Sequence, residues 1–168
     1  MTDQNSEIPT RTGSFRAAVR AGTTVTEYAR AGSGQPLLLL LTDAVEADSF
    51  AARVLAGVAD HFRVIAPAQI PTKEDFATWL ADFLDGLGLI QTSIVTEDRF
   101  GVPVLGFALL EPSRVDRLII LSDTAPETEN LDGSLAAPAQ GARPLLIVRR
   151  DGALDAVVSK VIRFLDPA

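Results

Sequence analysis

The chain has 168 residues, 47% of them hydrophobic and 22% charged, a balance typical of one globular domain rather than of a disordered chain. Its formal net charge of -7 argues against a nucleic-acid partner, because phosphate binding needs clustered Lys and Arg. The absence of Cys excludes disulfides, Cys-ligated metal sites and a thiol nucleophile.

The N-terminal residues 1–13 are polar and lack the basic and apolar regions of a signal peptide. We therefore predict a flexible tail over 1–13, a single domain over 14–168 and a cytoplasmic location. The longest unbroken apolar run, 37–41, is too short to cross a bilayer, so no membrane partner is expected.

Two strand-like runs open the domain and meet at Gly22, which predicts an N-terminal β-hairpin over 14–31. The run PLLLLLT at 36–42 follows and is apolar at nearly every position. Such a run indicates a strand that is buried on both faces of a parallel sheet covered by helices.

Helices and strands alternate over the rest of the chain. The predicted segments are a helix over 47–59, a strand over 62–68, a helix over 72–87, a strand over 92–97, a helix over 102–112, a strand over 115–122, a strand over 144–150 and a helix over 153–165. Asp48 or Ser49 is expected to cap the first helix, and Thr72 the second, with Asp75 in an imperfect capping box. This alternation predicts an α/β fold with a mostly parallel sheet and helices on both faces.

Two connections carry no regular pattern. Residues 96–99, Thr-Glu-Asp-Arg, are predicted to form a polar turn between a strand and a helix. Residues 123–142 are rich in Pro, Ala and Gly and are predicted to form a surface loop.

Five phrases, in this order, resemble the α/β-hydrolase fold family. They are EYARAGSGQPLLLLLTD, FRVIAPAQIP, FLDGLGL, PSRVDRLIIL and PLLIVRRDG. The resemblance covers 14–168 and implies a member without the family's lid domain, because only about twenty residues link the strand over 115–122 to the next one. The family's final strand is expected to be missing as well, since the segment after 144–150 runs almost directly into the terminal helix.

The resemblance places Asp98 at the position of the catalytic nucleophile. This nucleophile stands on a tight strand-to-helix elbow, usually G-x-nucleophile-x-G, and haloalkane dehalogenases and epoxide hydrolases of the family use Asp there. Both flanking glycines are replaced here, and bulky Phe100 stands where the turn is tightest, although Gly101 follows it. Asp98 is therefore either a nucleophile or a polar turn and helix-cap residue.

The other catalytic positions are altered too. His61 is the only His in the chain, and it lies before the strand over 62–68, where it is expected at the far end of the sheet from the elbow. Asp151 matches the position of the family's acid but has no His to orient, so a turn residue before Gly152 is the alternative. Thr42 and Asp43 replace the usual His-Gly of the oxyanion loop, and an Asp there would repel a developing oxyanion.

Further charged residues are expected near the elbow. Asp43, Glu46, Asp48, Glu97 and Asp98 could meet at the carboxyl end of the sheet, either as solvated turn residues or as ligands of a divalent cation. Arg99, Arg149 and Arg150 could instead pair with these carboxylates and fill the site. No resident metal or cofactor is predicted.

The favoured hypothesis is a compact, degenerate α/β-hydrolase-like protein without hydrolytic activity that acts in binding or assembly. Thr42, Asp43, Arg99 and Phe100 would line the former site. A homodimer is expected through the sheet edge at 144–150 or the terminal helix, because exposed strand edges invite pairing. The alternatives are a hydrolase of esters or alkyl halides that uses Asp98, and a binder of a small hydrophobic ligand.

Overall fold

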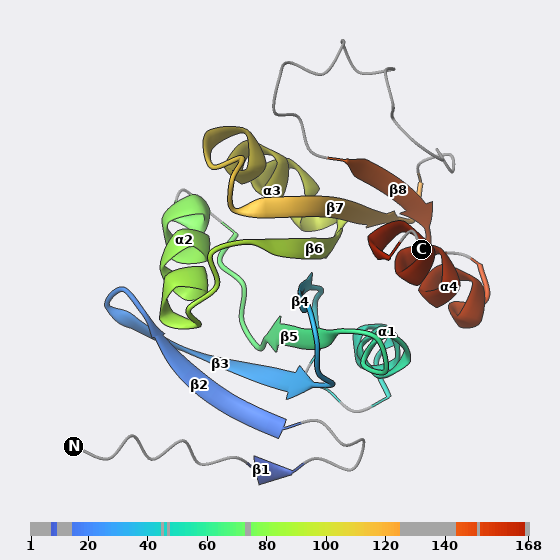
Figure 1. Cartoon of the computed structure of the whole chain (residues 1–168), viewed down its shortest axis with the longest axis horizontal. Helices are drawn as coiled ribbons and strands as arrows, with labels where there is room; N and C mark the ends of the chain where they lie inside the picture. Colours follow the sequence, from blue (N-terminus) through green and yellow to red (C-terminus); the bar gives the residue numbers. More distant parts are fainter. Residues whose placement is uncertain are drawn as a thin grey trace.

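The chain folds around one eight-stranded sheet with the strand order β1-β2-β3-β5-β4-β6-β7-β8 (Figure 1). The computed structural model describes residues 8–9, 15–44, 46, 48–72, 75–124, 144–150 and 152–166. The elements are β1 (Ile8–Pro9), β2 (Phe15–Ala21), β3 (Thr24–Ala31), β4 (Pro36–Leu40), α1 (Phe50–Val58), β5 (Arg63–Pro67), α2 (Phe76–Gly86), β6 (Thr92–Glu97), α3 (Asp98–Leu110), β7 (Val115–Ser122), β8 (Leu145–Arg149) and α4 (Leu154–Leu165).

The sheet has an antiparallel and a parallel part. β2 and β3 form the predicted hairpin, whose turn uses the left-handed backbone of Gly22 at φ 58. β3 joins the rest of the sheet by antiparallel pairing with β5, whereas β4 to β8 are parallel to one another. The predicted mostly parallel α/β architecture is thus confirmed.

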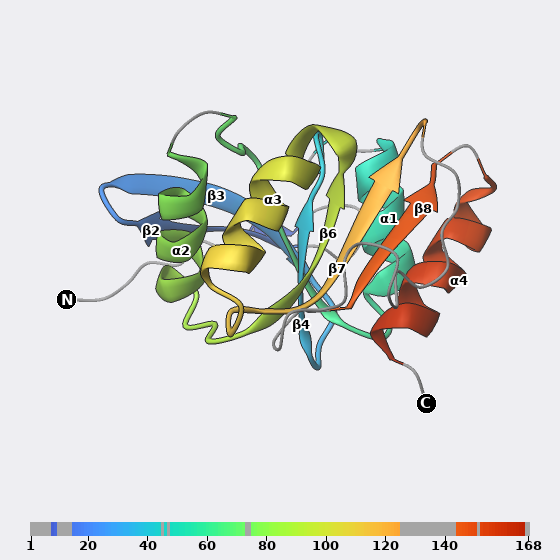
Figure 2. The same cartoon turned by 90° about the horizontal axis from the view of Figure 1, so that it is seen from above.

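Helices cover both faces of the sheet (Figure 2). α1 and α4 lie together on one face, and α2 and α3 lie on the other. β4 is the centre of the sheet, and its side chains alternate between the two apolar cores, with Leu37 and Leu39 in one and Leu38 and Leu40 in the other. All four are fully shielded from solvent, which explains why this strand reads as a continuous apolar run.

The starts of two helices differ from the sequence prediction. α2 begins at Phe76 with Asp75 as its N-cap, so Thr72 does not cap it. Asp75 is exposed, and Phe76 is the first residue of the helix that the core buries, so the helix begins where its packing begins. α3 begins at Asp98 rather than at 102, and β6 extends to Glu97, so no separate polar turn exists at 96–99.

Three predicted features fall at least partly outside the described residues. Within the expected tail 1–13, Ile8–Pro9 pair antiparallel with β2, and the other residues of that range are not described. The same holds for 125–143, most of the predicted surface loop, and for Asp151. Among the helices that the structure describes, none has the length and apolarity that a membrane span requires.

Candidate functional site

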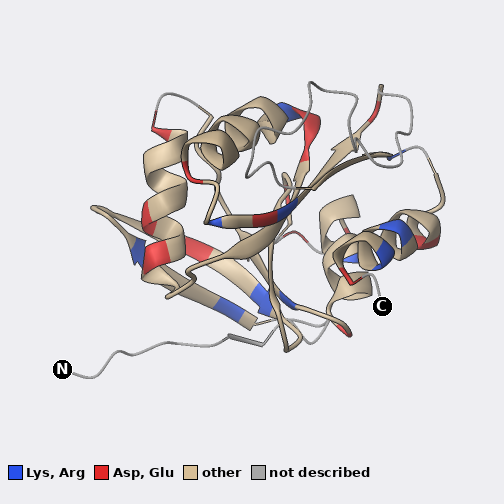
Figure 3. Cartoon of the chain, turned by 45° about the horizontal axis from the view of Figure 1, so that its top comes forward, with Lys and Arg blue, Asp and Glu red and all other residues tan. Residues whose placement is uncertain are grey.

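The carboxyl ends of the parallel strands bring the candidate residues together at one edge of the sheet. Thr42 follows β4, Glu97 ends β6, Asp98 begins α3 and Arg150 follows β8. Figure 3 shows the acidic pair at the β6–α3 junction. This is the edge at which open α/β sheets usually bind their ligands.

Asp98 is held by the end of the neighbouring strand β7. Its Oδ2 accepts hydrogen bonds from the hydroxyl of Ser122 at 2.7 Å and from the backbone N–H of Asp123 at 3.1 Å. Asp98 is exposed and lies in the first turn of α3, where the helix dipole favours a carboxylate. Its backbone is not left-handed, because among the described non-glycine residues only Asp43 and Asp48 have positive φ. The junction is therefore a direct strand-to-helix transition rather than a strained elbow.

Among the described carboxylates at this edge Glu97 is the most buried, with a relative exposure of 9%. Its Oε1 accepts hydrogen bonds from both the hydroxyl and the backbone N–H of Thr42, the latter at 3.3 Å. Its Oε2 lies 3.3 Å from Nη1 of Arg150. The carboxylate thus joins the loop after β4 to the residue that follows β8.

Arg150 completes this network by balancing the negative charge. Its Nε lies 3.6 Å from Oδ1 of Asp123, and its guanidinium carbon lies 4.6 Å from the centre of the Phe50 ring. Its side chain is 26% exposed, so the ion pair with Glu97 is shielded from most of the solvent. Of the three arginines predicted to pair with the acidic residues, Arg150 therefore does so with Glu97.

The loop after β4 takes a left-handed conformation at Asp43, with φ 61. The carbonyl oxygen of Asp43 accepts hydrogen bonds from the backbone N–H of Glu46 at 2.9 Å and from the hydroxyl of Ser49 at 2.8 Å. Ser49 is also the N-cap of α1, since its hydroxyl accepts a bond from the N–H of Ala52. These bonds attach the loop to the start of α1.

The remaining predicted site residues lie apart from this network. Arg99 is exposed, and its guanidinium carbon lies 5.7 Å from the centre of the Phe100 ring. Phe100 is buried in the core beneath α2 and α3, so it does not fill a cleft above Asp98. His61 precedes β5 at the opposite end of the sheet, as expected from the sequence.

The structure does not group the acidic residues as metal ligands. Within the described ranges, no set of three or more His, Cys, Asp or Glu side chains is arranged to hold a metal ion. Glu97, which the sequence offered as a ligand, is instead bonded to Thr42 and Arg150.

Sequence reasoning identified Arg150 as a possible partner of these carboxylates but missed Thr42 and Ser122. Thr42 lies 55 positions from Glu97, and Ser122 lies 24 positions from Asp98. The usable signal was positional, because Thr42, Ser122 and Arg150 all stand at or just beyond the carboxyl ends of predicted strands that neighbour β6 or β7.

The comparisons with known proteins agree with this architecture. The carboxylesterase YbfK of Bacillus subtilis (strain 168) is 32% identical over 65 residues, which are 39% of this chain and 22% of that protein. The crystal structure of that carboxylesterase has a TM-score of 0.54 at 24% identity and covers 64% of this chain and 42% of its own. This chain has the α/β-hydrolase fold.

Two other solved hydrolases share the fold. A serine hydrolase involved in carbazole degradation, the CarC enzyme, has a TM-score of 0.55 at 26% identity and covers 65% of this chain and 48% of its own. The epoxide hydrolase CorEH has a TM-score of 0.53 at 23% identity and covers 76% of this chain and 47% of its own. No protein-family model matches the chain. The chain thus spans less than half the length of these α/β-hydrolase-fold relatives.

Proposed function

We propose that this chain is a non-catalytic α/β-hydrolase-fold protein that acts by binding or assembly. The observation that carries the proposal is the contact between Glu97 and the loop after β4, because that loop corresponds to the oxyanion loop of the fold. The backbone N–H of Thr42 donates to the Glu97 carboxylate at 3.3 Å. A donor that would stabilise a substrate oxyanion is thus occupied by an internal anion.

The charge of Glu97 strengthens this argument. An oxyanion hole works because preorganised donors meet negative charge as it develops, and loss of one donor typically lowers kcat by about 100-fold to 1000-fold. Here a buried carboxylate both takes a donor and adds repulsion toward a second anion. Acyl transfer at this edge is therefore disfavoured on both grounds.

The nucleophile position is unfavourable as well. A nucleophilic Asp needs an open approach for substrate and a base that activates water for hydrolysis of the ester intermediate. The accepting oxygen of Asp98 is held by Ser122 and by the N–H of Asp123. The chain's only His, His61, lies at the other end of the sheet.

The rival function is a hydrolase of esters or alkyl halides, and the exposure of Asp98 at the carboxyl edge favours it. A panel of nitrophenyl esters and haloalkanes separates the two, with Asp98→Asn compared with Asp116→Asn on β7. We expect wild type and both variants to match the uncatalysed rate. Turnover that Asp98→Asn abolishes and Asp116→Asn preserves would overturn the non-catalytic proposal.

The proposed assembly is a homodimer through β8 or the adjoining α4. β8 ends the strand order, and its described pairing is with β7 on one side. An unpaired edge of a parallel sheet is a template for a strand of a second copy. We expect light scattering at micromolar concentration to give the mass of a dimer, and Ile147→Lys on β8 to shift it toward monomer. Val25→Lys, at an exposed position of β3, is the control, and a monomeric wild type would contradict the proposal.

A further inference from the structure

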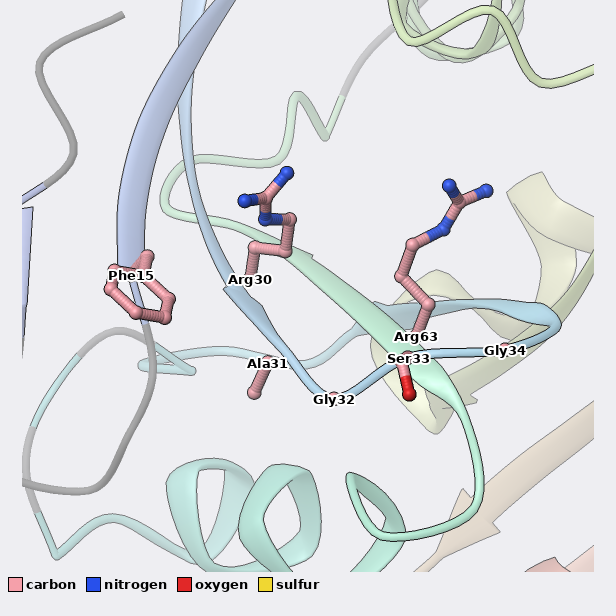
Figure 4. Close-up of a pocket in the computed structure, with 7 residues that line it drawn as sticks. All are labelled: Phe15, Arg30, Ala31, Gly32, Ser33, Gly34 and Arg63. Atoms are coloured by element: carbon pink, nitrogen blue, oxygen red, sulfur yellow. The ribbon is translucent and has the colours of Figure 1, made fainter.

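Three neighbouring strands present Phe15, Arg30 and Arg63 to the same side of the sheet at its other end (Figure 4). Phe15 of β2 lies opposite Arg30 of β3, and Arg30 lies opposite Ile65 of β5. Arg63 stands two positions before Ile65, so its side chain leaves the same face. Together with the turn 31–34, these side chains line a pocket of about 310 Å³.

Arg63 has unused hydrogen-bonding capacity in this pocket. Its Nε is shielded from solvent and finds no acceptor in the described part of the chain, where its side chain also forms no ion pair. The Nε of Arg114 is likewise shielded and without a partner, but its Nη2 donates to Asp85 at 2.7 Å and to the carbonyl of Leu89 at 3.1 Å. A guanidinium presents planar, paired donors whose geometry matches a phosphate or carboxylate. In Arg63 the whole guanidinium is without a partner in the described part of the chain, so it can receive an acceptor from a ligand.

The charge of the pocket points to the same kind of ligand. Two of the described residues that line it, Arg30 and Arg63, are ionisable, and both are positive. The chain as a whole carries a formal net charge of -7, so two positive side chains beside one pocket differ from the chain's average. An anion in the pocket would gain chiefly from the guanidinium of Arg63, which forms no hydrogen bond or ion pair in the described part of the chain.

The remaining wall of the pocket is apolar. Phe15 is 39% exposed and offers a ring face beside Arg30. The volume is at the lower end of the range of about 300–1,000 Å³ for small-molecule sites, which limits the ligand to one ring or a similar body. Gly32 and Gly34, in the turn beside the arginines, have φ values of 74 and 98, a left-handed backbone that favours glycine.

We propose that this pocket binds a small oxyanion carried on an aromatic or apolar body, such as an aryl phosphate or an aryl carboxylate. The guanidinium of Arg63 binds the oxyanion, and the ring of Phe15 contacts the body. The pocket lies at the amino end of the parallel strands, away from Asp98 and Glu97. The inference therefore stands whether or not the carboxyl edge is catalytic.

Titration of the labelled full chain with four probes, followed by amide NMR shifts and calorimetry, tests the proposal. The probes are phenyl phosphate, benzoate, inorganic phosphate and phenol. We expect phenyl phosphate or benzoate to shift amides near Phe15, Arg30 and 32–34, and to bind at least tenfold more tightly than phenol. Preference between the first two probes identifies the oxyanion.

Matched variants separate the contributions of charge and ring. Arg63→Gln should weaken binding of the aryl anion about tenfold or more, whereas Arg53→Gln, which removes one charge from an exposed position of α1, should leave it unchanged. Phe15→Ala should remove the preference for phenyl phosphate over inorganic phosphate. Amide shifts elsewhere in wild type, equal affinity for phenol, or equal loss in Arg63→Gln and Arg53→Gln would each overturn the proposal. The wild-type shift map decides the question even if Arg63→Gln fails to fold.

Discussion

Replacement of Glu97 by Ala is expected to destabilise the fold measurably, because this side chain joins three segments of the carboxyl edge. The substitution removes the acceptor for the hydroxyl and N–H of Thr42 and for Nη1 of Arg150. Hydrogen bonds to charged groups contribute about 1.5–3 kcal/mol each when they are short and shielded. The contacts of the Thr42 N–H and of Arg150 are both 3.3 Å long, which places them at the weak end of that range.

The released partners limit the loss further. Thr42 is exposed and can bond to water, and Arg150 keeps its contacts with Asp123 and the ring of Phe50. The penalty of about 3–5 kcal/mol for breaking a fully buried pair therefore does not apply. We expect Glu97→Ala to lower the free energy of unfolding by about 2 kcal/mol. Glu97→Gln keeps an acceptor oxygen and loses only the charge, so about 1 kcal/mol is expected.

Urea unfolding followed by circular dichroism measures both values. With an m-value of about 2 kcal/mol per molar urea, the midpoint should fall by about 1 M for Glu97→Ala and about 0.5 M for Glu97→Gln. Glu27→Ala, at an exposed position of β3, is the control and should change stability by less than about 0.5 kcal/mol. If Glu97→Gln were as stable as wild type, the ion pair with Arg150 would not stabilise this edge, and the reasoning would fail.

Three other substitutions test the fold around the two sites. Gly32→Ala should lower the free energy of unfolding, measured by a thermal melt, by about 3 kcal/mol. The reason is that φ is 74 and the new Cβ would lie 2.1 Å from the carbonyl oxygen of Ala59. Gly106→Ala in α3 should instead stabilise the protein by about 1 kcal/mol, because the new Cβ meets no atom within 4 Å. A lower melting temperature than that of wild type would contradict this. Thr26→Val removes the acceptor of the Trp79 Nε1–H at 3.1 Å and should cost about 1–2 kcal/mol. It should also shift the emission of the chain's single Trp, and unchanged emission would refute the hydrogen bond.

The sheet and helices could be predicted because burial repeats along the sequence. The run of leucines before Thr42 alternates between two cores, and each predicted helix has an apolar face that the structure buries. Helix starts were harder to predict, because polar residues there contribute little to the core. In the predicted helix over 102–112, Pro103 lies in the first turn, where proline is tolerated. α3 instead begins at Asp98 and continues through Pro103, whose missing N–H removes one helical hydrogen bond.

The contacts of the site could not be predicted in the same way. The position of Asp98 followed from the order of the elements, but its bonds to Ser122 and Asp123 depend on how β7 ends beside β6. The amino-end pocket was missed for the same reason. Arg30 and Arg63 are separated in sequence and meet because β3 pairs antiparallel with β5, and no local pattern encodes that pairing.

The balance of charge at the two ends of the sheet decides where an anionic ligand is favoured. At the carboxyl end, Arg150 lies between Glu97 and Asp123, so its charge is already matched by two carboxylates. An incoming anion there would have to displace Glu97 and meet its repulsion, even though this is the usual ligand edge of an α/β sheet. At the amino end, the described ionisable residues that line the pocket, Arg30 and Arg63, are both positive. Arg63 forms no ion pair in the described part of the chain, so its charge is available to an anion, whereas the charge of Arg150 is already matched. Oxyanion chemistry at the carboxyl edge would instead require unmatched donors there.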